Sequence, residues 1–514
     1  MKRLAMTVVA VAVILMSAMP AKAQQQNFTV SFGGQMRLYG LVWDNFTDFT
    51  DTDKASKVFD QSLVGRAKDS EAYYFQRWRL FTTVESADKN AKVVWAIEVG
   101  DISWGLGGGA SGDEYGTGTN ARIGQSQGGG LGADGVNVET KNLYLQFNIP
   151  GVPNSNILLG AHNIVFMASP AGGFMDDDGW GIQLNFKWDP VDLQLYTVKI
   201  DENTRASADD NTMYVARVGV NLPGDTRITA EFMTVDEQCF ARRAVPAGSP
   251  TGTVGSCVSA DFLDTFWLGG TVGTKIAGIT LHGSAVYGLR QLWSATNQAI
   301  IEESGYGLQL VAQVPLGPLS TWWHAWYTSG DESRITGGGC EDVTAHPACG
   351  RLIQGLDFST NNNSTNLLRD SDKLPLPITG ASWGNVPFVA EFLRGMFLIG
   401  APGFGSTHYA DATGTWGLGG SATYALTPAF SVGGGVAYLA ATEESTGCVV
   451  TGLPGGPVST RCGGGVYGDN AIEIDAGAIW RYNPNLTITA LVGYVIPDEG
   501  DDAWGATFRT QFSF

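Results

Sequence analysis

Apolar and polar residues alternate along most of the chain. In the stretch FTVSFGGQMRLYG, Phe28 and Phe32 share one face of an extended strand, and Arg37 lies on the other face. The same period of two recurs in segments of ten residues or more, up to the final Phe514. Because successive side chains of a strand point to opposite faces, the pattern predicts long strands that are apolar on one side only.

The connections between these segments alternate in length. Short ones contain Pro, Gly, Asn or Asp, as tight turns require, and the longer ones between them are rich in Gly and Asp. This order is expected of an up-and-down barrel, in which one rim has turns and the other has loops. Eighteen strands are predicted, at residues 27–43, 72–85, 91–105, 137–149, 156–167, 179–188, 190–201, 211–222, 225–236, 261–276, 278–293, 304–315, 318–329, 414–426, 428–441, 469–482, 485–497 and 503–514. Sixteen strands result if one weak segment is misread, and twenty if 370–410 contains a hairpin.

The polar faces of these strands carry charges at their centres. A sandwich would bury its apolar faces in a dry core, whereas a membrane barrel presents them to lipid and lines its lumen with polar residues. The charges favour an all-β, transmembrane, antiparallel barrel with a wet lumen, whose last strand pairs with its first because open edges do not occur in hydrocarbon. The predicted lining residues are Arg37, Arg77, Arg79, Glu98, Lys187, Arg217, Arg227, Glu473, Asp475, Arg481 and Arg509.

The first 23 residues have the features of a secretory signal peptide. Lys2 and Arg3 precede an apolar run that is too short to span a bilayer, and Ala21-Lys22-Ala23 fits a cleavage site. The predicted mature domain is therefore 24–514. Loss of three positive charges takes the formal net charge from −19 to −22. Such an acidic chain is a poor partner for nucleic acid, which requires basic surfaces.

Six cysteines fall in the long connections, in three local pairs. An even number in an exported chain favours disulfides, and neighbouring cysteines are the simplest partners. The absence of CxxC and CxxCH spacings makes zinc and c-type haem poor alternatives, and the sequence predicts no cofactor. The pairs are Cys239 with Cys257, Cys340 with Cys349, and Cys448 with Cys462.

The organisation of the whole mature chain resembles a Gram-negative outer-membrane porin. The resemblance is carried by the leader, the opening strand FTVSFGGQMRLYG, the hairpin YFQRWRLFTTVESADKNAKVVWAIEVG and a C-terminal strand that ends on an aromatic residue. It implies an integral outer-membrane location, a homotrimer, and a final strand that the barrel-assembly machinery reads. That signal would comprise Trp504, Phe508, Phe512 and Phe514. It also implies that Arg37, Arg77 and Arg79 form a basic ladder.

Arg509 joins this ladder in a closed barrel, because the first, second and last strands are then neighbours. The arginines could guide anions or carboxylated solutes through the lumen. Alternatively, they pair with Glu98, Glu473 and Asp475 and only hold the wall together. Acidic loops at the mouth would attract cations, so the sequence leaves the selectivity open.

Three other motifs have a simpler interpretation beside a functional one. Asp176, Asp177 and Asp178 could bind calcium but lack the EF-hand spacing, and an exposed acidic loop is the simpler interpretation. Tryptophans of TWWHAWY (321–327) could stack on sugars, although aromatic girdles at the membrane interface are commoner. His282 and Ser284 share a face, but a hydrolase would need a third, orienting group.

The long connection at about 330–413 departs from the alternating pattern. Apolar residues in FVAEFLRGMF repeat with helical spacing, which predicts a short helix at 388–397. Porins fold their third loop inward, but the corresponding segment here, about 168–178, is short. The long connection is therefore the expected constriction, or else a plug. The predicted function is passive diffusion of small hydrophilic solutes without turnover chemistry; a substrate-specific channel for carboxylates or sugars and a plugged receptor or structural barrel are the alternatives.

Overall fold

The structure, a computed structural model, describes the strands and most of their short turns. The described residues are 28–44, 71–104, 138–168, 175–201, 211–237, 261–294, 299–329, 332–337, 415–441, 448–451, 459–462, 470–497 and 502–514. The predicted signal peptide (1–23), the predicted helix at 388–397 and the cysteines Cys239, Cys257, Cys340 and Cys349 lie outside these ranges. Within them, no helix is long and apolar enough to cross a membrane.

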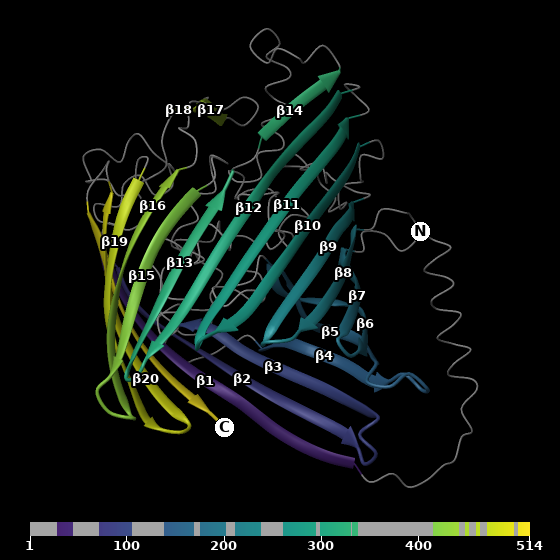
Figure 1. Cartoon of the computed structure of the whole chain (residues 1–514), viewed down its shortest axis with the longest axis horizontal. Coiled ribbons are helices and arrows are strands. Elements are labelled where there is room, and N and C mark those ends of the chain that lie inside the picture. Colours follow the sequence, from purple (N-terminus) through teal and green to yellow (C-terminus); the bar gives the residue numbers. More distant parts are fainter. Residues whose placement is uncertain are drawn as a thin grey trace, which may run out of the picture.

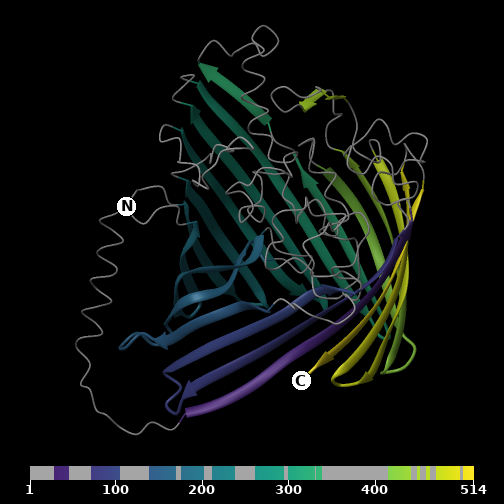
Figure 2. The ribbon, with the colours of Figure 1, turned by 180° about the vertical axis from the view of Figure 1, so that it is seen from behind.

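Nineteen strands form one antiparallel sheet, and eighteen of them succeed one another around a closed ring. The ring closes where β21 pairs with β1, from Gln35 opposite Ser513 to Asp44 opposite Trp504 (Figures 1 and 2). The ring strands are β1 (Phe28–Asp44), β2 (Glu71–Ser86), β3 (Ala91–Ser103), β4 (Val138–Asn148), β5 (Asn156–Phe166), β6 (Met175–Trp188), β7 (Val191–Asp201), β8 (Asn211–Leu222), β9 (Thr226–Glu237), β10 (Asp261–Ile276), β11 (Ile279–Ser294), β12 (Ala299–Leu316), β13 (Leu319–Thr328), β15 (Thr415–Ala425), β16 (Phe430–Ala441), β19 (Asn470–Asn483), β20 (Leu486–Pro497) and β21 (Ala503–Ser513).

The predicted fold class is confirmed: the chain forms a closed antiparallel up-and-down barrel of eighteen strands. Two strand starts were predicted too late, since β6 begins at Met175 and β12 at Ala299. The loop-side end of β12 also pairs with β14 (Glu332–Gly337), so the segment predicted as a loop at 330–413 opens with a strand. The remainder of that segment lies outside the described residues.

Two further strands form a separate hairpin. β17 (Cys448–Thr451) pairs with β18 (Ser459–Cys462), and the register places Cys448 directly opposite Cys462. Directly opposed positions of an antiparallel pair have short separations between their Cα atoms. The backbone register therefore agrees with the predicted partnership of these two cysteines, and the bond itself stays a prediction.

Short turns collect at one rim of the ring, where β1 begins and β21 ends (Figure 1). The β2–β3 turn is held by Asp88, whose carboxylate accepts hydrogen bonds from the Ser86 hydroxyl at 2.6 Å and the Asn90 backbone N–H at 3.0 Å. The bond from Ser86, followed by those from Asn90, holds the pKa of Asp88 below its ordinary value. Such local side-chain bonds explain why Ser, Asp and Asn recur in the turns.

The outer face of the ring is apolar. Along each strand the exposed large apolar side chains share one face, whereas the buried side chains lie on the other. Leu310 and Leu418 are examples, with 57% and 56% of their surface exposed. A continuous exposed apolar band of this kind marks a surface that a nonpolar phase covers.

Aromatic residues border this band near both rims. They contact one another in pairs whose ring centroids are 5.3–6.1 Å apart. The pairs are Tyr306–Tyr327 and Trp416–Tyr438 towards the loop rim, and Trp480–Tyr482 and Phe512–Phe514 towards the turn rim. Aromatic girdles at these two levels are a feature of barrels that span a bilayer.

Candidate functional site

Four arginines converge on the inner face where the ring closes. Arg37 of β1 lies directly opposite Arg77 of β2, and Arg509 of β21 lies opposite Tyr39 of β1. Arg79 follows Arg77 on the same face of β2. The structure therefore brings together the four positions that the sequence predicted for the basic ladder. We call these four residues the arginine cluster.

Glu98 of β3 neutralises part of the arginine cluster. Its carboxylate forms an ion pair with Arg79 and lies 3.4 Å from Nε of Arg77, and only 4% of Glu98 is exposed. The second sequence-based interpretation, that the arginines pair with acids and hold the wall, therefore applies to these two. A carboxylate shared by two arginines fixes them in place and reduces the positive charge they present.

Arg37 and Arg509 differ from their two neighbours. Arg37 donates from Nε to the Gln35 side-chain oxygen at 2.8 Å and from Nη1 to the Tyr39 hydroxyl at 3.3 Å. No described carboxylate forms an ion pair with Arg37 or Arg509. Their positive charge remains directed at the lumen, where it attracts anions.

The other predicted lining charges are spread over the rest of the ring. Arg227 of β9 pairs with Asp192 at 2.8 Å, and Arg217 of β8 pairs with Glu231 at 3.0 Å. Lys187 and Arg481 are exposed towards the turn rim. None of these four lies against the arginine cluster in the strand register, so the predicted lining residues do not form one site.

Glu473 and Asp475 of β19 form no ion pair with any described arginine, contrary to the second interpretation of the ladder. Both are almost fully buried, and within the described residues Oε1 of Glu473 and both oxygens of Asp475 lack a hydrogen-bond donor. The register places the small residues Ala437 and Gly435 opposite them on β16. This pair of carboxylates gives the inner wall an acidic position separate from the arginine cluster.

The β5–β6 hairpin leaves the wall and folds inward. β4 accompanies β5 only as far as Ala161, and β7 meets β6 only from Trp180 onward. Beyond these points the two strands pair only with each other, up to Phe166 opposite Met175. Phe166 and the following Met167 are completely buried.

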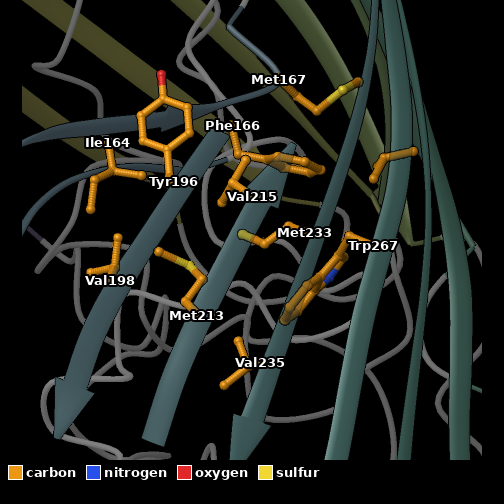
Figure 3. Packing of buried hydrophobic residues seen from close by; sticks show 11 residues of the cluster. Ile164, Phe166, Met167, Tyr196, Val198, Met213, Val215, Met233, Val235 and Trp267 are labelled. Carbon is orange, nitrogen blue, oxygen red and sulfur yellow. The ribbon is translucent and has the colours of Figure 1, made fainter. Parts of the chain in front are cut away.

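The tip of this hairpin packs on the inner wall formed by β7 to β11. Figure 3 shows the Phe166 ring beside Met233 of β9 and Trp267 of β10. The Met167 side chain extends away from these two and lies against Gly269 of β10. The remaining members of the cluster are Ile164, Tyr196, Val198, Met213, Val215, Val235 and Val286. Burial of these apolar side chains against the inner face explains how the hairpin is retained there.

Polar contacts hold the same tip at its backbone. Arg217 donates to the carbonyl oxygen of Val165, and the Met167 backbone N–H donates to Oε2 of Glu231 at 2.8 Å. The pairing of Arg217 with Glu231 fixes both contacts. The third connection therefore reaches the inner wall although its loop is short. The expected constriction by the long connection at 330–413 lies almost entirely outside the described residues.

The interpretation of the three aspartates of MDDDG as an exposed acidic loop is wrong. Asp176, Asp177 and Asp178 belong to β6 and pair with β5, so they are not a loop. Asp178 forms an ion pair with Lys141 and accepts a hydrogen bond from Asn142 at 3.3 Å. Within the described residues, no group of three acidic, His or Cys side chains is arranged to hold a metal ion.

The tryptophans of TWWHAWY separate onto two faces, as the alternation predicts. His324 and Trp326 are buried on the inner face, with ring centroids 5.1 Å apart, whereas Trp323 is half exposed on the outer face. His282 and Ser284 are in contact, with Nε2 3.0 Å from Oγ. Desolvated neighbours on one strand do not make a catalytic unit without an orienting group, so this pair carries no argument for hydrolysis.

Comparisons with known proteins give likenesses at the level of the barrel alone. No family model matches the sequence, and no curated protein matches it. Among solved structures, the chain is similar to the outer membrane protein OpdK of Pseudomonas aeruginosa, with 8% identity, a TM-score of 0.46, and coverage of 94% of this chain and 98% of the other. OpdQ of the same organism has 10% identity and a TM-score of 0.46, with coverage of 94% of this chain and 97% of the other. The outer membrane channel DcaP of Acinetobacter baumannii has 12% identity and a TM-score of 0.40, with coverage of 96% and 99%. Likenesses this distant carry no functional argument.

Proposed function

We propose that this chain is an integral outer-membrane channel through which small hydrophilic solutes diffuse passively. The observation that carries the proposal is a closed eighteen-strand ring with an apolar outer face and a charged inner face. Closure gives each strand of the ring a hydrogen-bonded neighbour on both sides within the wall, which hydrocarbon demands, and a ring of this size encloses a water-filled lumen.

The arrangement of charge favours a channel that discriminates among solutes. Arg37 and Arg509 face the lumen without a described carboxylate partner, whereas Arg77 and Arg79 share Glu98. A carboxylated solute could replace the missing partner and form charge-assisted hydrogen bonds with these two arginines. A carboxylate-selective channel is therefore the second candidate function.

Four features of assembly complete the proposal. Residues 1–23 direct export and are removed, and the mature barrel associates as a homotrimer surrounded by outer-membrane lipid. Disulfides join the three neighbouring cysteine pairs, and the register of Cys448 and Cys462 supports one of them. The barrel-assembly machinery reads the last strand, where Trp504, Phe508, Phe512 and Phe514 are all exposed on the outer face.

Ion current through single molecules in a planar bilayer tests the proposal. Purified protein under a salt gradient should produce steady ohmic steps, and the reversal potential gives the sign of selectivity. Folded protein, verified by heat-modifiable gel mobility, that produces no current would refute an open channel and favour a plugged barrel.

A further inference from the structure

A hollow of about 450 Å³ lies in the inner wall between β4 and β9. Seven of its twelve lining residues carry a carboxamide, and only three carry a charge. Six of the seven carboxamide side chains lie on the inner faces of β4 to β8, and the seventh, Asn154, lies in the β4–β5 turn. The carboxamide residues are Gln146, Asn154, Asn156, Gln183, Asn185, Gln194 and Asn221.

Three carboxamides form a hydrogen-bonded row across β5 and β6. Nε2 of Gln183 donates to Oδ1 of Asn185 at 2.6 Å, and Nδ2 of Asn185 donates to Oδ1 of Asn156 at 2.8 Å. Each amide nitrogen has two hydrogens, so the row orients its members and still leaves donors unused. Within the described residues, Nδ2 of Asn156 has no acceptor.

A second group of carboxamides continues the row on β7 and β8. Oε1 of Gln194 accepts hydrogen bonds from the Tyr196 hydroxyl at 2.9 Å and from Arg217 at 2.8 Å. Oδ1 of Asn221 accepts from Arg227 at 2.8 Å. In both residues the amide oxygen accepts the hydrogen bonds that the structure describes, and the amide nitrogen has no described acceptor.

Two of the three charged side chains in the hollow form an ion pair. Arg227 and Asp192 pair at 2.8 Å, and their side chains lie across Gly219, where even a Cβ atom would collide with them. Lys187 is opposite Asp192 in the register and is exposed at the turn rim. The hollow therefore offers many neutral donors and acceptors and a net formal charge of only +1, from Lys187.

The hollow lies next to the inward hairpin. Arg217 donates from Nη1 to Gln194, which lines the hollow, and from Nη2 to the carbonyl of Val165 in the inward hairpin. A solute that passes the hairpin tip from the loop side next meets the carboxamides of the hollow. Such a position suits a group that selects solutes by contact.

We propose that this hollow is a binding subsite for a neutral, polyhydroxylated solute, specifically a mono- or disaccharide. The proposal rests on the proposed function and deepens it by naming a substrate class. Vicinal hydroxyls both donate and accept hydrogen bonds, and adjacent carboxamides held in fixed orientation match them on both counts. The volume falls in the range of small-molecule sites.

Block of single-channel current by sucrose tests this subsite. Sucrose added to an open wild-type channel should interrupt the current at a concentration that defines half-block. Asn185→Leu removes the central member of the row at nearly constant volume, and we expect half-block to require roughly three- to tenfold more sucrose, the effect of one or two lost hydrogen bonds. Asn185→Gln should restore most of the block. Gln511→Leu, a carboxamide deletion on β21 outside the hollow, should leave it unchanged.

The outcomes separate the subsite from the channel itself. Ohmic steps that sucrose does not interrupt, or equal loss of block in Asn185→Leu and Gln511→Leu, would overturn the subsite and leave the channel standing. Absence of current would refute the channel. Saturation-transfer NMR of sucrose on detergent-solubilised protein then still tests the hollow, with Asn221→Leu as an independent variant that should reduce the transfer; no reduction would overturn the subsite.

Discussion

The inner face of this barrel has two walls built on different chemistry. On the wall formed by β21, β1, β2 and β3, four arginines lie close together, and two of them share one buried carboxylate, Glu98. On the wall from β4 to β9, carboxamides predominate, and the charged side chains are mostly paired. We call these the arginine wall and the carboxamide wall.

The two walls act on solutes over different distances. Uncompensated charge influences an ion across about a Debye length, roughly 8 Å at physiological salt, so the arginine wall acts before contact. A carboxamide acts only within hydrogen-bonding distance, and only on a solute that fits it. The difference implies that one wall governs which ions enter and the other governs how long a neutral solute remains.

Release of the inward hairpin is expected to have the largest effect, because the hairpin controls access to the carboxamide wall. Phe166→Ala removes a completely buried aromatic side chain and should weaken docking of the tip by about 3–5 kcal/mol. The ring hydrogen bonds do not depend on this residue. Single-channel conductance should therefore rise while heat-modifiable mobility of the barrel is retained.

The matched control for this release is Phe232→Ala on the outer face of β9, where the ring is 41% exposed. It deletes the same side chain without touching the hairpin, so its conductance should equal that of the wild type. Equal conductance in Phe166→Ala and the wild type would show that the hairpin does not constrict the lumen.

Charge reversal at Arg37 should have the next largest effect, and it should distinguish the roles of the two walls. Arg37→Glu replaces a cation that has no described carboxylate partner, so the reversal potential under a tenfold salt gradient should move towards cations. The reversal potential itself must stay between about −59 and about +59 mV, the limits for a monovalent ion. Half-block by sucrose should not change, because the carboxamide wall is untouched. Arg481→Glu, exposed at the turn rim, should shift the potential less; an equal shift would mean that only total charge matters.

Neutralising Glu98 tests how much of the positive charge of the arginine wall this carboxylate compensates. Glu98→Gln leaves Arg77 and Arg79 without their shared carboxylate and should lower stability by about 1–3 kcal/mol, measured as a shift in the urea midpoint of gel mobility. The freed charge should move the reversal potential towards anions. Gln35→Leu, which removes a neutral partner of Arg37, provides the control. A shift towards cations in Glu98→Gln would contradict the proposed field.

The sequence was sufficient to predict the ring but not what lies inside it. Strand positions such as Asp261–Ile276 agree with the prediction because alternation and turn residues are local signals, and they act on every strand in the same way. The proximity of Arg37 and Arg77 followed from the pairing of consecutive strands, and that of Arg509 followed from closure. Once the first and last strands must pair, inner-face residues on neighbouring strands are brought together.

The contents of the lumen depend on contacts between distant parts of the chain. Arg217 and Val165 are 52 residues apart, and no period or motif indicates that the hairpin tip crosses to that wall. Asn156 and Asn185 are neutral residues in ordinary strands and stand out only when the register places them side by side. The charged residues could be identified as lining candidates from the sequence because charge is rare in a strand. Carboxamides give no comparable signal.

The smallest effect is expected at the turn below the arginine wall. Hydrogen bonds from Ser86 and Asn90 lower the pKa of Asp88 beneath its ordinary value of 3.8. A lowered carboxylate pKa contributes stability above the unfolded pKa, and this contribution is lost as the pH falls through the folded pKa. Asp88→Asn should therefore reduce the slope of melting temperature against pH between about pH 5 and about pH 2. Asp225→Asn, in the turn below the carboxamide wall, is the control. Only Asp88 accepts hydrogen bonds from Ser86 and Asn90, so only its substitution should act through local bonds. An equal change of slope in both variants would mean that the effect comes from net charge instead.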